Sequence, residues 1–122
     1  MRVLLDHNVT RKLRACLPGH EVRTAREMAW ERLRNGALLQ AAADGGFDAF
    51  VTVDKNMEYE RNLSRLALPV VVLNVPSNAL PSLTPTLPAL QQLLAAALDP
   101  ALYVIEPSGQ VLRIATSRPR TI

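Results

Sequence analysis

Two short apolar stretches of the sequence each run directly into an Asp-x-Asn triplet, and this repetition restricts the fold more than any other feature. Residues 2–5 are followed by Asp6-His7-Asn8, and residues 49–53 by Asp54-Lys55-Asn56. Stretches this short and this apolar are typical of buried strands. In an open parallel sheet the strands end at a common edge, and ligands bind in the crevice outside their carboxyl ends. The sequence therefore predicts that both triplets lie at one edge of a sheet.

The side chains of the two triplets suit a cation. Carboxylate and amide oxygens are the hard ligands that Mg²⁺ or Mn²⁺ prefers, and the triplets supply them from Asp6, Asn8, Asp54 and Asn56. We therefore predict a Mg²⁺ or Mn²⁺ site at this edge. A second interpretation stays open, because Asp and Asn directly after a strand are also common turn and helix-capping residues.

The order of the expected elements indicates an α/β fold. Strands are expected over residues 2–5, 21–24, 47–53 and 69–73, with a helix over 11–17, a helical turn over 25–30, a helix over 37–44 and a helical or irregular segment over 58–66 between them. Such alternation favours a mainly parallel central sheet with right-handed crossovers. A proline-rich connection over 76–88 leads into a helix over about 86–98. The last two strands, over 102–106 and 111–115, flank a four-residue turn and should form a C-terminal β-hairpin.

The size and composition of the chain fit one cytoplasmic domain. Its 122 residues suffice for a single core. No apolar run is long enough to span a bilayer, so we expect a soluble protein. Cys16 is the single cysteine, which excludes an internal disulfide and agrees with a reducing cytoplasm. We expect one folded unit over residues 1–116 and a basic tail over residues 117–122.

The charge of the chain suits an anionic partner such as a nucleic acid. The formal net charge is +3 at pH 7, and cations near the site would hold the phosphates of a nucleic acid. The candidates for this contact are Arg11, Lys12, Arg14, Arg34 and Lys55. The alternative is that these cations balance neighbouring carboxylates. Glu27 and Glu31 either lie near the site or, more simply, are solvated ion-pair partners of the arginines around them.

The second half of the chain is poor in charge and rich in proline. Eight of the nine prolines lie after residue 66. An apolar surface of this kind is typical of an interface, so we expect a homo-oligomer through this half or a protein partner covering it. An apolar core with proline-braced loops explains the same composition equally well.

Five stretches of the chain form a recognisable pattern through their order and spacing. They are Leu4-Leu5-Asp6-His7-Asn8, Gly19-His20-Glu21-Val22, Asn35-Gly36-Ala37-Leu38-Leu39, residues 47–56 and Val70-Val71-Val72-Leu73. This pattern resembles the short PIN-like proteins related to VapC-type toxin nucleases, over roughly residues 1–75. The resemblance implies a three-layer PIN-like fold with an acidic pocket at the strand ends. It also implies RNA cleavage by water activated on Mg²⁺ or Mn²⁺, and a toxin whose partner is an antitoxin protein.

The resemblance also implies which residues carry the chemistry. Position by position, Asp6 and Asp54 match the catalytic metal ligands of the family. Three positions depart from its pattern: His7 stands for a Glu, Asn35-Gly36 for an acidic residue, and Asn56 for an Asp. Affinity for a hard cation falls with the charge of its ligands. The alternative function is therefore a PIN-like module of weakened catalysis that binds RNA or a protein partner.

Three further residues are candidates for the same site, each with a simpler alternative. Glu58 follows Asp54 by four residues and either folds back to the site or is an ordinary first-turn glutamate. Asn35 is either a pocket amide or a helix cap. His7 has a ring suited to a softer metal or to acid–base work, although strand alternation directs it away from Asp6. Asp48 begins the strand that Asp54 ends, and we expect it at the opposite edge.

Overall fold

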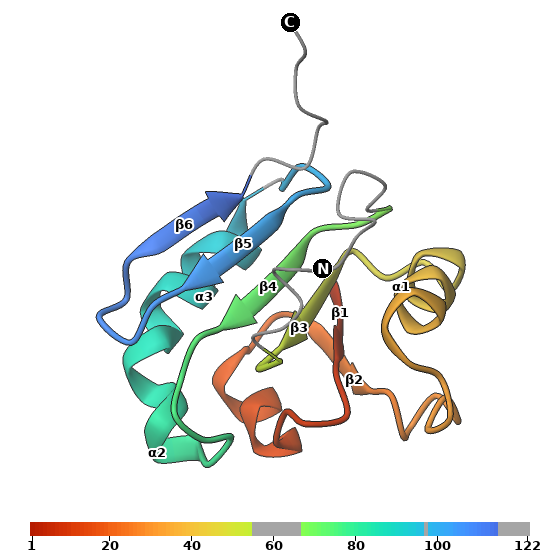
Figure 1. Cartoon of the computed structure of the whole chain (residues 1–122), viewed down its shortest axis with the longest axis horizontal. Helices are drawn as coiled ribbons and strands as arrows, with labels where there is room; N and C mark the ends of the chain where they lie inside the picture. Colours follow the sequence, from red (N-terminus) through yellow and green to blue (C-terminus); the bar gives the residue numbers. More distant parts are fainter. Residues whose placement is uncertain (55–66, 97, 115–122) are drawn as a thin grey trace, which may run out of the picture.

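The computed structural model describes residues 1–54, 67–96 and 98–114, and its centre is a six-stranded sheet (Figure 1). The strand order is β2-β1-β3-β4-β5-β6. All neighbouring strands are parallel except β5 and β6, which form the predicted antiparallel hairpin. The strands are β1 (Arg2–Leu5), β2 (Glu21–Thr24), β3 (Ala49–Thr52), β4 (Val70–Leu73), β5 (Leu102–Ile105) and β6 (Val111–Ile114). The prediction of an α/β fold with a mainly parallel sheet is confirmed.

Helices cover both faces of this sheet because its central strands are apolar on both sides. On one face, Leu4 and Phe50 pack in a cluster with Leu38 of α1 (Asn35–Asp44). On the other face, Leu5 packs in a cluster with Leu90, and this face carries η1 (Arg11–Cys16), α2 (Leu80–Leu83), η4 (Thr84–Thr86) and α3 (Leu87–Ala95). We call these the α1 face and the α3 face. The chain thus forms three layers (Figure 1).

The helical segments differ from expectation in two places. The first, expected as a helix over residues 11–17, is a 3₁₀ helix, and the Thr10 hydroxyl at its start accepts from the Lys12 amide at 3.3 Å. The second difference lies in the proline-rich stretch, expected as a connection, which is helical from Leu80. Proline is compatible with a helix in its first turn, where the missing amide hydrogen is not needed, and here the prolines fall at such positions. Three short helical segments therefore follow one another.

The order of the strands defines where a ligand site belongs. From β1 the chain winds first to β2 on one side, and later continues from β3 outward on the other. In doubly wound sheets the crevice for a ligand lies at the carboxyl ends of the two strands where the winding reverses. In this order those strands are β1 and β3. They are also the two strands that run into the Asp-x-Asn triplets.

None of the helices in the described residues is long and apolar enough to cross a lipid bilayer. The longest of them, α1, has ten residues, whereas a bilayer requires about twenty.

Candidate functional site

The side chain of Asp6 is fixed at the exit of β1 by two hydrogen bonds. Its Oδ1 accepts from the backbone amide of His7 at 2.7 Å, and its Oδ2 accepts from the hydroxyl of Thr52 at 2.7 Å. The backbone amide of Asp6 in turn donates to the Val51 carbonyl at 2.9 Å, which extends the β1–β3 pairing by one residue. The carboxylate is half-buried and held against the end of β3.

Thr52 joins the two strand ends. Besides donating to Asp6, its Oγ1 accepts from the backbone amide of Asp54 at 2.9 Å. Thr52 is completely buried, so this hydroxyl has no access to water and both of its bonds are made within the protein. Sequence reasoning missed Thr52. The signal was present, because Thr52 is the one hydroxyl-bearing residue in the otherwise apolar stretch 49–53, and a buried hydroxyl needs partners.

Asn8 and Asp54 border a hollow at the same end of the sheet, separate from the pocket that Asp6 lines. Both line a hollow of about 500 Å³ together with residues of the loop after β4, including Ser77 and Asn78. The Asn78 amide donates to the Asn8 carbonyl at 3.0 Å. The Oδ1 of Asn8 is buried and makes no hydrogen bond within the described residues. The structure therefore brings Asp6, Asn8 and Asp54 to one edge of the sheet, as predicted from the triplets.

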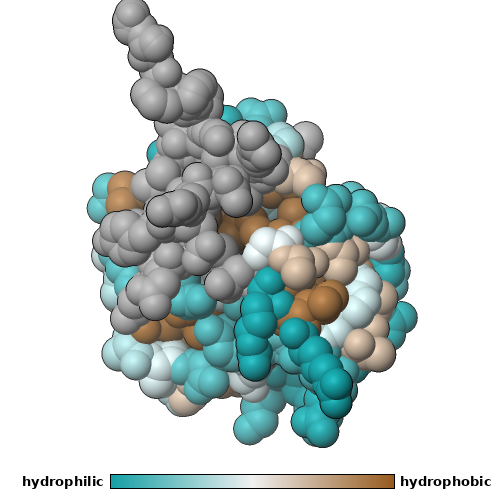
Figure 2. All heavy atoms as spheres, turned by 45° about the vertical axis from the view of Figure 1, so that its right-hand side comes forward, coloured by the Kyte–Doolittle hydropathy of each residue, from teal (hydrophilic) through white to brown (hydrophobic). Residues whose placement is uncertain are grey.

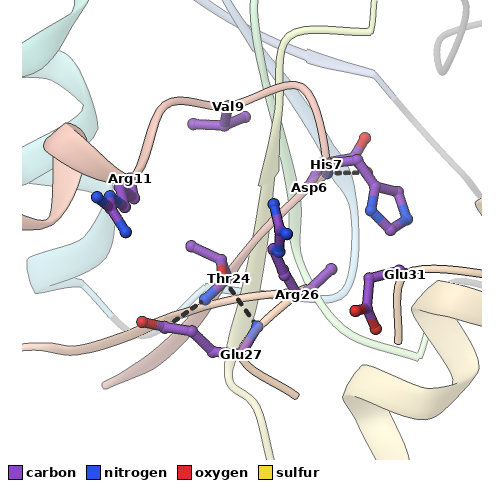
Figure 3. A pocket seen from close by; sticks show the side chains of 9 residues that line it. Asp6, His7, Val9, Arg11, Thr24, Arg26, Glu27 and Glu31 are labelled. Carbon is purple, nitrogen blue, oxygen red and sulfur yellow. Dashed lines mark hydrogen bonds between the residues drawn. The ribbon is translucent and has the colours of Figure 1, made fainter. Parts of the chain in front are cut away.

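The larger pocket of this edge, about 800 Å³, lies between the β1 exit and the segment after β2. Figure 3 shows His7 and Glu31 on one side of the pocket, Arg11 on the other and Arg26 between them. Glu27 also lines the pocket. Of the two interpretations given above for Glu27 and Glu31, the position near the site applies, because both share a pocket with Asp6.

The carboxylate of Glu27 is engaged by its neighbours. It forms a salt bridge with Arg14 and accepts a hydrogen bond from the Thr24 amide at 3.0 Å. The backbone amide of Glu27 in turn donates to the Thr24 hydroxyl at 3.1 Å. The hydrogen bond from Arg14, followed by the one from the Thr24 backbone, holds the pKa of Glu27 below its ordinary value. Glu27 therefore stays ionised, and its salt bridge with Arg14 agrees with the alternative that this cation balances a neighbouring carboxylate.

His7 lines the same pocket as Asp6. The alternation that was expected to direct it away from Asp6 does not apply, because β1 ends at Leu5. Its Nε2 lies 2.8 Å from the carbonyl oxygen of Leu33. Since a carbonyl only accepts, Nε2 carries the hydrogen, and in the neutral ring Nδ1 is left as an acceptor.

The remaining predicted residues are spread around this edge. Arg11 lines the larger pocket, and Lys12 lines a third hollow together with His7 and Asn8. Arg34 is exposed and precedes α1. Asn35 begins α1, but its side chain lies outside the described part of the chain, as do Lys55, Asn56 and Glu58.

Asp48 lies at the opposite edge of the sheet, as expected. Its carboxylate accepts from the Arg2 amide at 2.7 Å, at the start of β1.

The donors present fit a hard cation, although few of them are charged. No group of three or more His, Cys, Asp or Glu side chains that could hold a metal occurs within residues 1–54, 67–96 and 98–114. A carboxylate offers about four lone pairs, and the two hydrogen bonds of Asp6 leave some of them for a cation. The buried Oδ1 of Asn8 adds a neutral oxygen. An all-oxygen set of this kind suits Mg²⁺ or Mn²⁺ at low affinity.

The fold and the candidate site define the class of the protein. It is an α/β protein with a six-stranded, mostly parallel sheet, and carboxylates lie at its switch point, where the winding reverses between β1 and β3. Neither family models nor curated proteins nor solved structures give a match to this chain.

Proposed function

We propose that this protein is a metal-dependent ribonuclease of the PIN-like class and the toxin component of a toxin–antitoxin pair. The observation that carries the proposal is the position of Asp6 and Asp54. They follow the two adjacent strands at which the winding of the sheet reverses, and one buried hydroxyl connects them. Ligand sites of doubly wound sheets lie at such a point. The resemblance of the five sequence stretches to PIN-like nucleases supports the same function.

In this mechanism Asp6 and Asp54 hold Mg²⁺ or Mn²⁺, with Asn8 as a neutral oxygen ligand. The bound cation supplies an acidified water and neutralises charge on the phosphate. The protein supplies orientation: the Thr52 hydroxyl and the His7 amide fix the two oxygens of Asp6. Arg11 and Lys12 border the pockets beside Asp6, where positive charge offsets the repulsion between these carboxylates and RNA.

The test compares RNA cleavage by the wild type with that of D6A and D54A in the presence of Mn²⁺ or Mg²⁺. We expect cleavage by the wild type, loss of at least about a hundredfold in either variant, since each removes a charged ligand, and full activity in D44A. Asp44 is a matched control, because it is exposed at the end of α1 and bonds only Gln40 among the described residues. Equal cleavage by all four proteins would attribute the activity to a contaminant and reject the proposal.

A second candidate function is a PIN-like module with weakened catalysis that binds RNA or a protein partner. It is favoured by the small number of charged ligands: the described residues contain no cluster of three acidic or metal-binding side chains. Titration calorimetry with Mn²⁺ separates the two functions. Saturable binding that D6N abolishes supports the nuclease, whereas no heat at millimolar Mn²⁺ supports the binding module.

The toxin assignment has its own test. A short adjacent open reading frame that encodes a DNA-binding protein would supply the antitoxin, and we expect that protein to co-purify with the chain. The absence of such a neighbour counts against a toxin without affecting the test of cleavage.

A further inference from the structure

The two outermost strands of the sheet, β2 and β6, carry different side chains. β2, at one edge, carries Glu21, whose carboxylate lies 3.4 Å from Arg2 and 3.3 Å from Arg23. β6 lies at the other edge (Figure 1) and carries Val111 and Leu112, which are 37% and 40% exposed. These two are the most exposed large apolar side chains of the described residues. Charged residues protect an edge strand from pairing with another chain, and an apolar edge favours such pairing.

The hairpin shows which backbone groups of β6 point away from β5. The Glu106 amide donates to the Gln110 carbonyl at 2.8 Å, so Gln110 directs its backbone groups toward β5. In an antiparallel pair the residues alternate in this respect. The backbone amide and carbonyl of Leu112 therefore point toward β5, where Leu112 pairs with Val104. Val111 and Arg113 direct their amide and carbonyl groups outward, away from the sheet.

These outward groups are self-complementary about a twofold axis. When two copies of β6 run antiparallel with Leu112 opposite Leu112, Val111 of each copy stands opposite Arg113 of the other. Val111 and Arg113 are the residues with outward groups, so each of these two pairs exchanges two hydrogen bonds. The two Leu112 residues form the intervening pair without hydrogen bonds, in which side chains approach most closely.

The charge on β6 disfavours one alternative register. A register centred on Arg113 would place two guanidinium groups opposite each other, which is unfavourable. In the register centred on Leu112, each Arg113 keeps its own partners. It lies 3.1 Å from Asp99 and 5.8 Å from the centre of the Tyr103 ring. The pairing therefore brings apolar side chains together and no unbalanced like charges.

From this complementarity we propose that β6 pairs with β6 of a second copy of the chain, centred on Leu112, and joins two sheets into one of twelve strands. Leu112 and its counterpart then lie side by side on the α1 face, next to Val104. Only a short strand from each copy takes part, so the interface falls at the small end of specific interfaces. The dimer is accordingly weak and forms in a concentration-dependent way.

Engineered cysteines test both the dimer and its register. In a C16S background, which removes the single native thiol, L112C places two thiols on residues whose Cα atoms are about 4.5 Å apart, within the span of a disulfide. We expect mild oxidation to give a covalent dimer on a non-reducing gel. V111C is the matched control: it is equally exposed, but it stands opposite Arg113 and should remain monomeric.

The uncrosslinked protein provides the second measurement, by light scattering across a concentration series. We expect the wild type to approach twice the chain mass, and both L112K and V111P to remain at the mass of one chain. V111P removes an outward amide only, so the β5–β6 pairing and the melting temperature should be retained. A wild type that stays monomeric at every concentration, or V111C that crosslinks as readily as L112C, would overturn the proposal.

Discussion

At the scale of single residues, the candidate site depends on a hydroxyl that belongs to the core. Thr52 is fully buried, donates to Asp6 and accepts from the Asp54 amide. A buried polar group contributes little net stability when paired, but it is costly when its partners are left unsatisfied. The same hydroxyl therefore contributes to the stability of the fold and positions the carboxylate of Asp6.

The substitution T52V separates these two contributions. Valine keeps the shape of threonine but leaves Asp6 Oδ2 and the Asp54 amide without this partner, so we expect a loss of about 1–2 kcal/mol in the free energy of unfolding, measured in urea. Under the proposed function it also weakens Mn²⁺ binding. T52S is the control, because it retains the hydroxyl and should bind Mn²⁺ more tightly than T52V. Identical Mn²⁺ affinity in both variants would limit Thr52 to a structural contribution.

The position of Asp6 and Asp54 could be predicted from the sequence, whereas the grouping of their neighbours could not. A polar residue after an apolar strand marks a sheet edge in any parallel fold. Glu27 and Glu31 lie in the same pocket because the segment between β2 and α1 brings them there. That segment is held by turns and by side-chain bonds such as that of His7 to the Leu33 carbonyl. Such bonds between distant residues leave no periodic pattern in a sequence.

At the scale of elements, the strands were easier to predict than the helices. The strands β1, β3, β4 and β5 lie where apolar runs place them, because burial on both faces of a sheet requires uninterrupted apolar residues. The edge strands β2 and β6 also lie where they were expected, although each carries charged residues. The segment from Leu80 to Thr86 was expected as a connection because of its prolines. A count of prolines does not distinguish helix interiors from first turns, and only the latter accept proline.

Two glycine-to-alanine substitutions, one in a turn and one in a helix, should change the free energy of unfolding in different directions. Gly109, in the β5–β6 turn, has a φ of +90°, so G109A should destabilise the protein by about 1 kcal/mol through backbone strain. Gly36 lies in α1, and an added Cβ there meets no atom within 4 Å. G36A should therefore be neutral or stabilising by up to about 1 kcal/mol. Urea unfolding measures both, and a stabilising G109A would contradict the left-handed turn.

At the scale of the whole molecule, exposed apolar side chains occur both on the side of α1 and on the edge strand β6. On the side of α1, apolar side chains form small patches among hydrophilic ones (Figure 2). The exposed apolar residues of β6 lie at the far edge of the sheet from β2. In the proposed dimer the twofold axis is perpendicular to the sheet, and the strands of the two copies run in opposite directions. The two candidate sites, at the carboxyl ends of β1 and β3 in each copy, therefore lie at opposite ends of the strands of the joined sheet. Each site would then bind RNA independently of the other.

A net charge of +3 would attract RNA to any part of the surface. The salt dependence of binding distinguishes this general attraction from a specific phosphate contact at the candidate site. Arg11 lines the pocket of Asp6, whereas Arg23 lies on the β2 edge beside Glu21. R11Q and R23Q each remove one positive charge, so they match in net charge. A lost phosphate contact lowers the slope of log affinity against log salt by about 0.7 for single-stranded RNA. We expect that decrease for R11Q and an unchanged slope for R23Q, measured by fluorescence anisotropy over a salt series. Equal slopes in the two variants would mean that RNA is held by overall charge, and the carboxylates at the switch point would then have no bound phosphate to act on.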